Sequence, residues 1–114
     1  MALKINREEL LENFMGDEEL LLESIDLFLE RAETRYATLV AAVAERDPVK
    51  IMEEGHTIKG MVGIFSTGDP FETAKKLEFM GRNKALDGVD EALVDFKANL
   101  DELTGYLAAW KEEL

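Results

Sequence analysis

The sequence predicts an all-α fold, in which four amphipathic helices form an antiparallel bundle and a short extra helix precedes them at the N-terminus. Apolar residues recur at steps of three and four along most of the chain, and no alternating apolar and polar run bounded by turn residues indicates a strand. With 114 residues, of which 46% are hydrophobic, the chain can build one core without disulfides or metal ions. We therefore expect residues 1–114 to form a single domain.

The N-terminal part of the chain is predicted to form the short first helix and a long second one. Asn6, followed by Glu9 three residues later, is a capping-box start, and Gly16 ends this first helix. Asp17 caps the second helix, which is expected to run to about Arg46. The core-facing positions of the second helix are Leu21, Ile25, Phe28, Ala32, Leu39 and Val43.

Two Asp-Pro pairs mark the starts of the third and fourth helices, because aspartate is a common N-cap and proline fits the first helical position. The third helix is expected to run from Asp47-Pro48 to about Ser66, and the fourth from Pro70 to about Met80. Gly81 follows as the expected C-terminal glycine of the fourth helix.

The last helix is expected to start at Asp87 and to carry a long apolar stripe with alternating four- and three-residue spacing. The stripe consists of Val89, Leu93, Phe96, Leu100, Leu103, Leu107 and Trp110. Such a stripe also occurs at the seam of a coiled coil between two chains. Four amphipathic helices joined by short loops can instead cover one another within one chain, so we expect a monomer.

Composition excludes several classes of function. The absence of cysteine removes disulfides, thiolate nucleophiles and cysteine-based zinc sites. The formal net charge of -12 argues against binding to nucleic acids or to anionic membranes, which both select basic patches. No apolar run approaches the roughly 20 residues of a membrane span, and the N-terminus lacks the apolar block of a signal peptide, so we expect a cytoplasmic protein. One histidine among scattered carboxylates makes a poor metal site, and no motif indicates a cofactor.

The only histidine, His56, is predicted to lie on the outer face of the third helix. On a helical wheel, the apolar residues of this helix fall on the side opposite the imidazole; they are Ile51, Ile58, Val62 and Phe65. Four other residues fall within about 60° of the imidazole: Met52, Lys59, Gly60 and Gly63. Glycine inside a helix costs roughly 1 kcal/mol relative to alanine, and here it removes side chains that would flank the ring. A plainer interpretation is that the glycines end the helix and that His56 is an ordinary surface residue.

Nucleophilic triads and nucleotide-phosphate loops are both excluded around this histidine. No nucleophile-elbow pattern lies beside it, and Met61 and Val62 stand where a phosphate loop starting at Gly55 needs lysine and then serine or threonine. The chemistry that remains is attack of a neutral ring nitrogen on phosphorus, with the other nitrogen held by a hydrogen bond. Glu78, at the edge of the fourth helix, is the candidate for that bond, although any glutamate at a bundle edge would look similar.

The run His56-Thr57-Ile58-Lys59-Gly60, followed by Gly63 and Phe65 and later by Leu77-Glu78, resembles the histidine-containing phosphotransfer (HPt) domains of bacterial phosphorelays. The resemblance covers nearly the whole chain. It implies that His56 accepts a phosphoryl group from the aspartyl phosphate of a response-regulator receiver domain and passes it to another receiver. It also implies a carrier without catalytic turnover of its own, with receivers and a histidine kinase as partners.

The same resemblance implies roles for the neighbours of His56. Lys59 would stabilise the phosphoryl group, and Glu78 would orient the imidazole. A docking surface for the receiver would surround them, with two glycines giving clearance. The resemblance places Gly60, Gly63 and Lys75 in this surface, and the helical wheel adds the apolar residues Met52 and Ile64, which lie near His56.

The sequence departs from the family pattern at two places and leaves two alternatives open. Many members have glycine ten residues after the histidine. This chain has Ser66 at that position, and its next glycine is Gly68. Members also tend to have alanine before the histidine, where Gly55 stands. The phosphate-accepting domain of chemotaxis-type kinases, which takes phosphate from ATP through a kinase domain, shares the same core and is the closest alternative. The other is an acidic helical adaptor in which His56 carries no phosphate.

Overall fold

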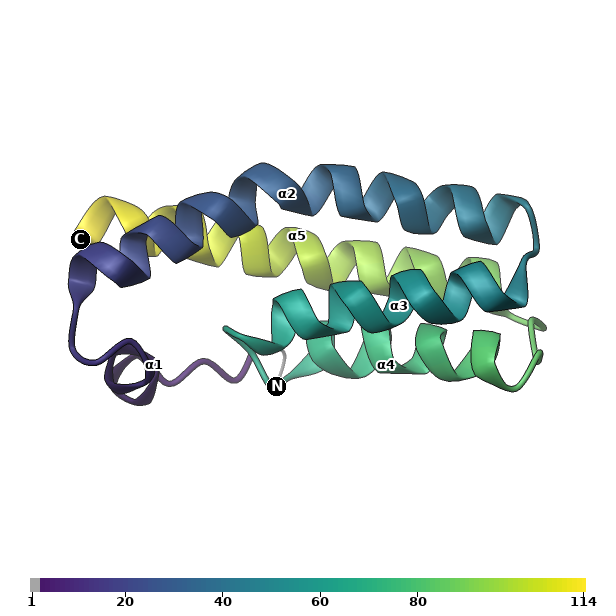
Figure 1. Ribbon diagram of the computed structural model, residues 1–114, viewed down its shortest axis with the longest axis horizontal. Helices are drawn as coiled ribbons and strands as arrows, with labels where there is room; N and C mark the ends of the chain where they lie inside the picture. Colours follow the sequence, from purple (N-terminus) through teal and green to yellow (C-terminus); the bar gives the residue numbers. More distant parts are fainter. Residues whose placement is uncertain (1–2) are drawn as a thin grey trace.

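The computed structural model describes residues 3–114, which form five helices joined by short connections (Figure 1). The helices are α1 (Arg7–Asn13), α2 (Glu18–Ala44), α3 (Pro48–Gly63), α4 (Asp69–Arg82) and α5 (Val89–Glu113). The described residues contain no strand, so the predicted all-α class is confirmed. None of these helices combines the length and the apolar character needed to cross a bilayer.

Helices α2 to α5 form an antiparallel four-helix bundle. Each helix packs against the next one in the chain, and α5 closes the ring by packing against α2. The long helices α2 and α5 extend through the whole molecule, whereas α3 and α4 form a shorter hairpin along part of that length (Figure 1). The short helix α1 lies at the end that α3 and α4 leave uncovered (Figure 1). The predicted bundle with its extra N-terminal helix is therefore confirmed.

The apolar positions predicted for each helix form the core. On α3, the residues opposite His56 are all buried: Ile51, Ile58, Val62 and, just beyond the helix, Phe65. The stripe of α5 also faces inward, with Leu93 only partly buried. Its buried members are Val89, Phe96, Leu100, Leu103, Leu107 and Trp110. Contacts within the chain thus cover the stripe that a coiled coil would otherwise use.

Side-chain caps start the first three helices where the sequence predicts them. In each case a side-chain oxygen accepts a hydrogen bond from the backbone N–H three residues later, at 3.1 or 3.2 Å; the capping residues are Asn6, Asp17 and Asp47. Such a cap stabilises a helix by about 1 kcal/mol. The first helical turns are therefore specified by residues that lie close together in the sequence.

Helix α5 begins two residues later than predicted. Gly88 has a φ of 82°, a left-handed conformation that favours glycine, and its carbonyl accepts a hydrogen bond from Ala92 N. Asp87 therefore lies before the turn instead of starting the helix, and α5 begins at Val89. The buried stripe is unchanged, because Val89 is still its first residue.

Helix α3 ends at Gly63, three residues before the predicted end at Ser66. The Ser66 side chain is buried, its hydroxyl donates a hydrogen bond to the carbonyl of Leu3, and it accepts one from Gly68 N at 3.1 Å. Ser66 therefore connects the N-terminal segment to the turn between α3 and α4. This contact gives the small polar side chain of Ser66 a structural role.

Gly81 does not end α4, which continues to Arg82. A Cβ atom at Gly81 would lie 2.5 Å from the backbone nitrogen of Met52, so a side chain there would collide with α3. A Cβ atom at Gly55 would likewise lie 2.9 Å from the backbone nitrogen of Glu78. The prediction of a C-terminal glycine is wrong because the close crossing of two helices, and not a chain reversal, requires glycine at this position.

Candidate functional site

His56 lies in the middle of α3 and its imidazole points away from the core. Its side chain is 68% exposed, whereas Ile58 two residues later is buried. This arrangement follows from the helical period, which places the histidine opposite the apolar stripe of α3. The imidazole is therefore accessible to a second molecule.

Glu78 of α4 is the buried centre of the site, with a side chain that is 1% exposed. Its Oε2 lies 3.1 Å from His56 Nδ1 and 2.9 Å from Arg82 Nη2. Its Oε1 lies 2.6 Å from Lys59 Nζ. A buried carboxylate without partners would strongly destabilise the fold, and these three groups compensate its charge. The structure thus brings together the three residues predicted for the chemistry and adds an arginine.

The pKa of Glu78 is lowered from its ordinary value. Burial, the largest single influence, raises the pKa because it disfavours the charged form, but the close contacts and the charges of Lys59 and His56 outweigh it. The carboxylate is therefore ionised at neutral pH and can only accept hydrogen bonds. It follows that His56 Nδ1 donates to Glu78 Oε2, and in the neutral ring Nε2 keeps its lone pair.

The contact between Lys59 and Glu78 is a close ion pair without the angles of a hydrogen bond. Lys59 Nζ approaches Oε1 at 2.6 Å, yet within residues 3–114 this buried oxygen has no hydrogen-bonding partner. The Lys59 side chain is partly exposed. The ion pair therefore places a positive charge beside the carboxylate that holds His56.

Comparison with known proteins identifies the family. The sequence matches the family model of the Hpt domain over residues 23–110. The chain belongs to the Hpt domain family. Hpt domains are histidine phosphotransfer carriers of phosphorelays that interact with receiver domains and histidine kinases, and this chain is such a carrier. The match favours this function over the chemotaxis-kinase and adaptor alternatives.

Two solved structures share the fold of this Hpt domain. The crystal structure of histidine-containing phosphotransfer protein B from Pseudomonas aeruginosa has a TM-score of 0.89 at 17% identity, and the similarity covers 100% of this chain and 99% of that one. The HPT domain of a sensor hybrid histidine kinase from Shewanella has a TM-score of 0.80 at 12% identity, with 96% and 95% covered. At such identities the likeness shows the fold alone. No curated protein sequence matches the chain.

The two glycines predicted to clear space near His56 have different surroundings in this Hpt domain. A Cβ atom at Gly60 would meet no other atom within 4 Å, so this position leaves open space one turn after the histidine. A Cβ atom at Gly63 would lie 3.2 Å from the ring of Phe71. Gly63 therefore permits close packing of α3 on α4, and its place in the docking surface stays a prediction.

Two residues predicted to dock the receiver lie on opposite flanks of His56. Met52 lines a shallow recess of about 270 Å³ together with the imidazole, Glu78 and Arg82. Ile64 is 54% exposed and lies on the other flank, at an apolar pocket of about 210 Å³ between α2 and α3. The imidazole therefore lies between a recess lined partly by charged side chains and an apolar pocket.

Two residues of α4, next to the predicted Lys75, extend the site beyond the predictions. Lys75, which the resemblance placed in the docking surface, lies with Nζ 5.7 Å from the centroid of the Phe79 ring. Phe79 and Arg82 were not predicted. The i to i+4 spacing from Glu78 to Arg82 is the signal for the arginine, and an aromatic residue outside the apolar stripe of α4 is the signal for Phe79.

The described residues offer no metal centre. Within residues 3–114, no three histidine or carboxylate side chains gather in an arrangement that could hold a metal ion. The carboxylate of Glu78 is instead surrounded by cationic and ring nitrogens. The groups that meet at this site are therefore suited to proton and phosphoryl chemistry on the imidazole.

Proposed function

We propose that His56 carries the phosphoryl group of this Hpt domain, accepting it from the aspartyl phosphate of one receiver and passing it to another. The observation that carries the proposal is the exposed imidazole whose Nδ1 is held by the buried carboxylate of Glu78. His56 is also the only histidine of the chain. A ring anchored through Nδ1 presents Nε2 to the phosphorus atom.

In the proposed step, the Nε2 lone pair of His56 attacks phosphorus. The bond between phosphorus and the aspartyl oxygen breaks, and the receiver carboxylate leaves with the electron pair. The ring becomes a phosphorylated imidazolium that keeps its proton on Nδ1, and the charge of Glu78 stabilises this cation. Transfer to the next receiver reverses the same events, so the domain returns unchanged without a turnover of its own.

Lys59 is the proposed stabiliser of the bound phosphoryl group. It lies three residues after His56 on the same face of α3, and its contact with Glu78 lacks hydrogen-bond geometry. We infer that its ammonium shifts from Glu78 Oε1 toward the phosphoryl oxygens when His56 is modified, because a charge-assisted hydrogen bond to a dianion is stronger.

The proposed docking surface lies around His56 and includes the pocket between α2 and α3. Ile64 and Leu27 are both about half exposed at this pocket, which also contains Phe28 and Met61. Exposed apolar side chains around a recess are typical of protein interfaces. Gly60 supports this location because no side chain covers the approach there.

We also propose that the domain works as a monomer. The buried stripe of α5 supports this, because contacts within the chain already cover the surface that a coiled coil would need. The cytoplasmic location stays a prediction from the sequence.

Phosphorylation of wild-type protein and of His56→Gln tests the proposed function. Each is incubated with phosphorylated receivers and, separately, with a histidine kinase and ATP. We expect acid-labile, base-stable label on the wild type and none on His56→Gln, with equal helix content by circular dichroism. Label that persists on the variant would rule out His56 as the carrier. Label transferred by the kinase but by no receiver would favour the chemotaxis-type alternative.

A further inference from the structure

A basic and aromatic ridge runs along α4 beside the proposed phosphorylation site. Phe79 is 40% exposed, and its ring offers an apolar surface on α4. Lys75 Nζ lies 5.7 Å and Arg82 Cζ lies 5.2 Å from the centroid of its ring. The ring is thus flanked by a cation from each neighbouring helical turn. We call Lys75, Phe79 and Arg82 the α4 ridge.

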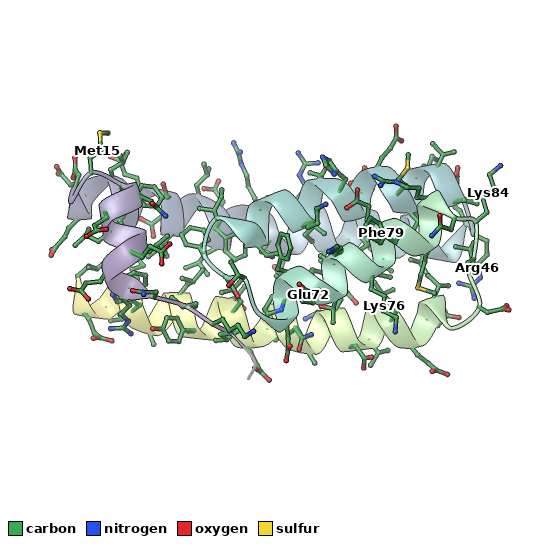
Figure 2. All side chains as sticks on the ribbon, turned by 90° about the horizontal axis from the view of Figure 1, so that it is seen from below. Met15, Arg46, Glu72, Lys76, Phe79 and Lys84 are labelled. Atoms are coloured by element: carbon green, nitrogen blue, oxygen red, sulfur yellow. The ribbon has the colours of Figure 1, made fainter. Side chains whose placement is uncertain are left out.

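The charge of this region is opposite to that of the whole molecule. The chain has a net charge of -12, yet residues 75–84 contain four basic residues and one acidic residue, the buried Glu78. Glu72, two turns before Phe79, lies beyond the basic stretch (Figure 2). Figure 2 looks onto α3 and α4 and shows Phe79 where α4 borders α3. Of these basic residues, Arg82 lines the recess that contains the imidazole, and Lys75 lies beside Phe79.

Arg82 connects the α4 ridge to His56. Its Nη2 lies 2.9 Å from Glu78 Oε2, the same oxygen that lies 3.1 Å from His56 Nδ1. Arg82 and the imidazole also line one shallow recess. A macromolecule that reaches the imidazole from the α4 side therefore contacts Arg82 and comes close to Phe79.

We propose that the α4 ridge docks the acidic surface that surrounds the aspartyl phosphate of a receiver domain. This inference rests on the proposed function, because it requires a receiver to approach His56. Charge complementarity selects the partner: an aspartyl phosphate is an anion, and on a protein of net charge -12 it is favoured where basic side chains gather. Phe79 supplies an apolar anchor between the two cations. Cations that rest on a ring are already ordered, so little conformational freedom is lost on binding.

Lys75→Glu and Phe79→Ala test the α4 ridge, and Arg82 is left in place because it also contacts Glu78. The second-order rate of phosphoryl transfer from a phosphorylated receiver is measured for each variant at low and high salt. We expect Phe79→Ala to lower the rate about tenfold at both salt concentrations, as for an apolar interface anchor. Lys75→Glu should lower it at least tenfold at low salt and much less at high salt, because salt screens exposed charges.

Lys97→Glu is the matched control. Lys97 of α5 also lies over an aromatic ring, with Nζ 5.4 Å from the centroid of Tyr36, and both residues border a hollow between α2 and α5. The substitution changes the net charge by the same amount as Lys75→Glu. We expect the Lys97→Glu rate to fall much less than the Lys75→Glu rate at low salt and to stay within about twofold of the wild type at high salt, since salt screens long-range charge effects. An equal loss of rate in both lysine variants would overturn the docking proposal, because net charge alone would then explain it.

Phosphoramidate, a small phosphoryl donor that needs no docking surface, separates this proposal from the proposed function. We expect the ratio of the receiver rate to the phosphoramidate rate to fall in the ridge variants. If neither donor labels His56 in the wild type, the proposed function fails. If the receiver labels the wild type and both ridge variants at one rate, the ridge proposal fails while the function stands. Equal losses with both donors, or losses only with a histidine kinase, would also overturn docking of a receiver on the ridge.

Discussion

Glu78 Oε2 lies 3.1 Å from His56 Nδ1, so a carboxylate that is 1% exposed holds a ring that is 68% exposed. One member of the pair belongs to the core and the other to the surface. The fold can therefore orient the imidazole without covering it. The two residues come from α4 and α3, so their distance depends on how closely these helices cross, which Gly55 and Gly81 permit.

Replacing Glu78 by alanine should change the tautomer of His56. In the wild type, the ionised carboxylate accepts the Nδ1 proton and leaves Nε2 unprotonated in the neutral ring. Without Glu78 both tautomers should be populated, which ¹⁵N chemical shifts of the single imidazole would report. Glu53→Ala is the control, because Glu53 lines the same recess without contacting the ring. Identical ¹⁵N spectra for the wild type and Glu78→Ala would show that the contact does not hold the tautomer.

Lys59→Ala should slow transfer to and from His56 without abolishing it. The variant loses one charge-assisted hydrogen bond to the phosphoryl group, about 2 kcal/mol or roughly thirtyfold in rate, while the nucleophile remains. Single-turnover transfer with labelled receivers would measure the change. Lys50→Ala, which removes an exposed lysine at the start of the same helix, should transfer at the wild-type rate. A wild-type rate for Lys59→Ala would exclude the proposed role.

Gly81→Ala and Gly55→Ala should both destabilise the fold. Their Cβ atoms would lie 2.5 Å and 2.9 Å from backbone atoms of the facing helix, so α3 and α4 would have to separate. Overpacking of this kind costs about 1–3 kcal/mol, which urea unfolding at neutral pH would detect. Gly105→Ala is the control. A Cβ atom there meets nothing within 4 Å, so this variant should gain up to about 1 kcal/mol from helix propensity.

The free energy of unfolding should decrease in acid partly because of Glu78. Its pKa is lowered in the folded state, so the folded protein binds fewer protons than the unfolded chain as pH falls. The stabilisation is complete above the pKa of an unfolded glutamate, about 4.3, and is lost as pH falls through the lower folded pKa. Urea unfolding over this pH range should show a smaller decrease for Glu78→Gln than for the wild type.

Glu113→Gln is the control for this pH dependence. Arg7 also lowers the pKa of Glu113, but this pair is exposed at the surface, so water and salt screen it. Its replacement should leave the acid profile close to that of the wild type. If Glu78→Gln and the wild type lost stability in parallel, the buried carboxylate would not be the source of the effect.

Gly60→Leu should block the receiver without harming the fold. A Cβ atom at Gly60 would meet nothing within 4 Å, and leucine is a better helix former than glycine, so thermal stability should not fall. Transfer from a receiver should fall at least tenfold because the new side chain occupies the approach to His56, while phosphoramidate should still label the histidine. Gly105→Leu, on α5, is the control and should transfer normally. Unaltered transfer by Gly60→Leu would place the docking surface elsewhere.

Local sequence determined much of the helical framework and the exposure of the histidine. Asn6, Asp17 and Asp47 cap helices through backbone groups three residues away, so their effect needs no tertiary contact. The exposure of His56 follows in the same way, because the period of a helix alone places it opposite Ile58. These features depend on spacing along one helix, and spacing is visible in the sequence.

Only the tertiary structure decided how the helices meet. The sequence predicts a helix end at Gly81 and does not show that Gly63 and Gly81 both lie where α3 and α4 touch. Arg82 and Lys59 converge on one buried carboxylate for the same reason. The helical period predicts which side of a helix a residue occupies. It does not predict how far away the neighbouring helix lies or how that helix is rotated about its axis, because both depend on the packing of the whole bundle.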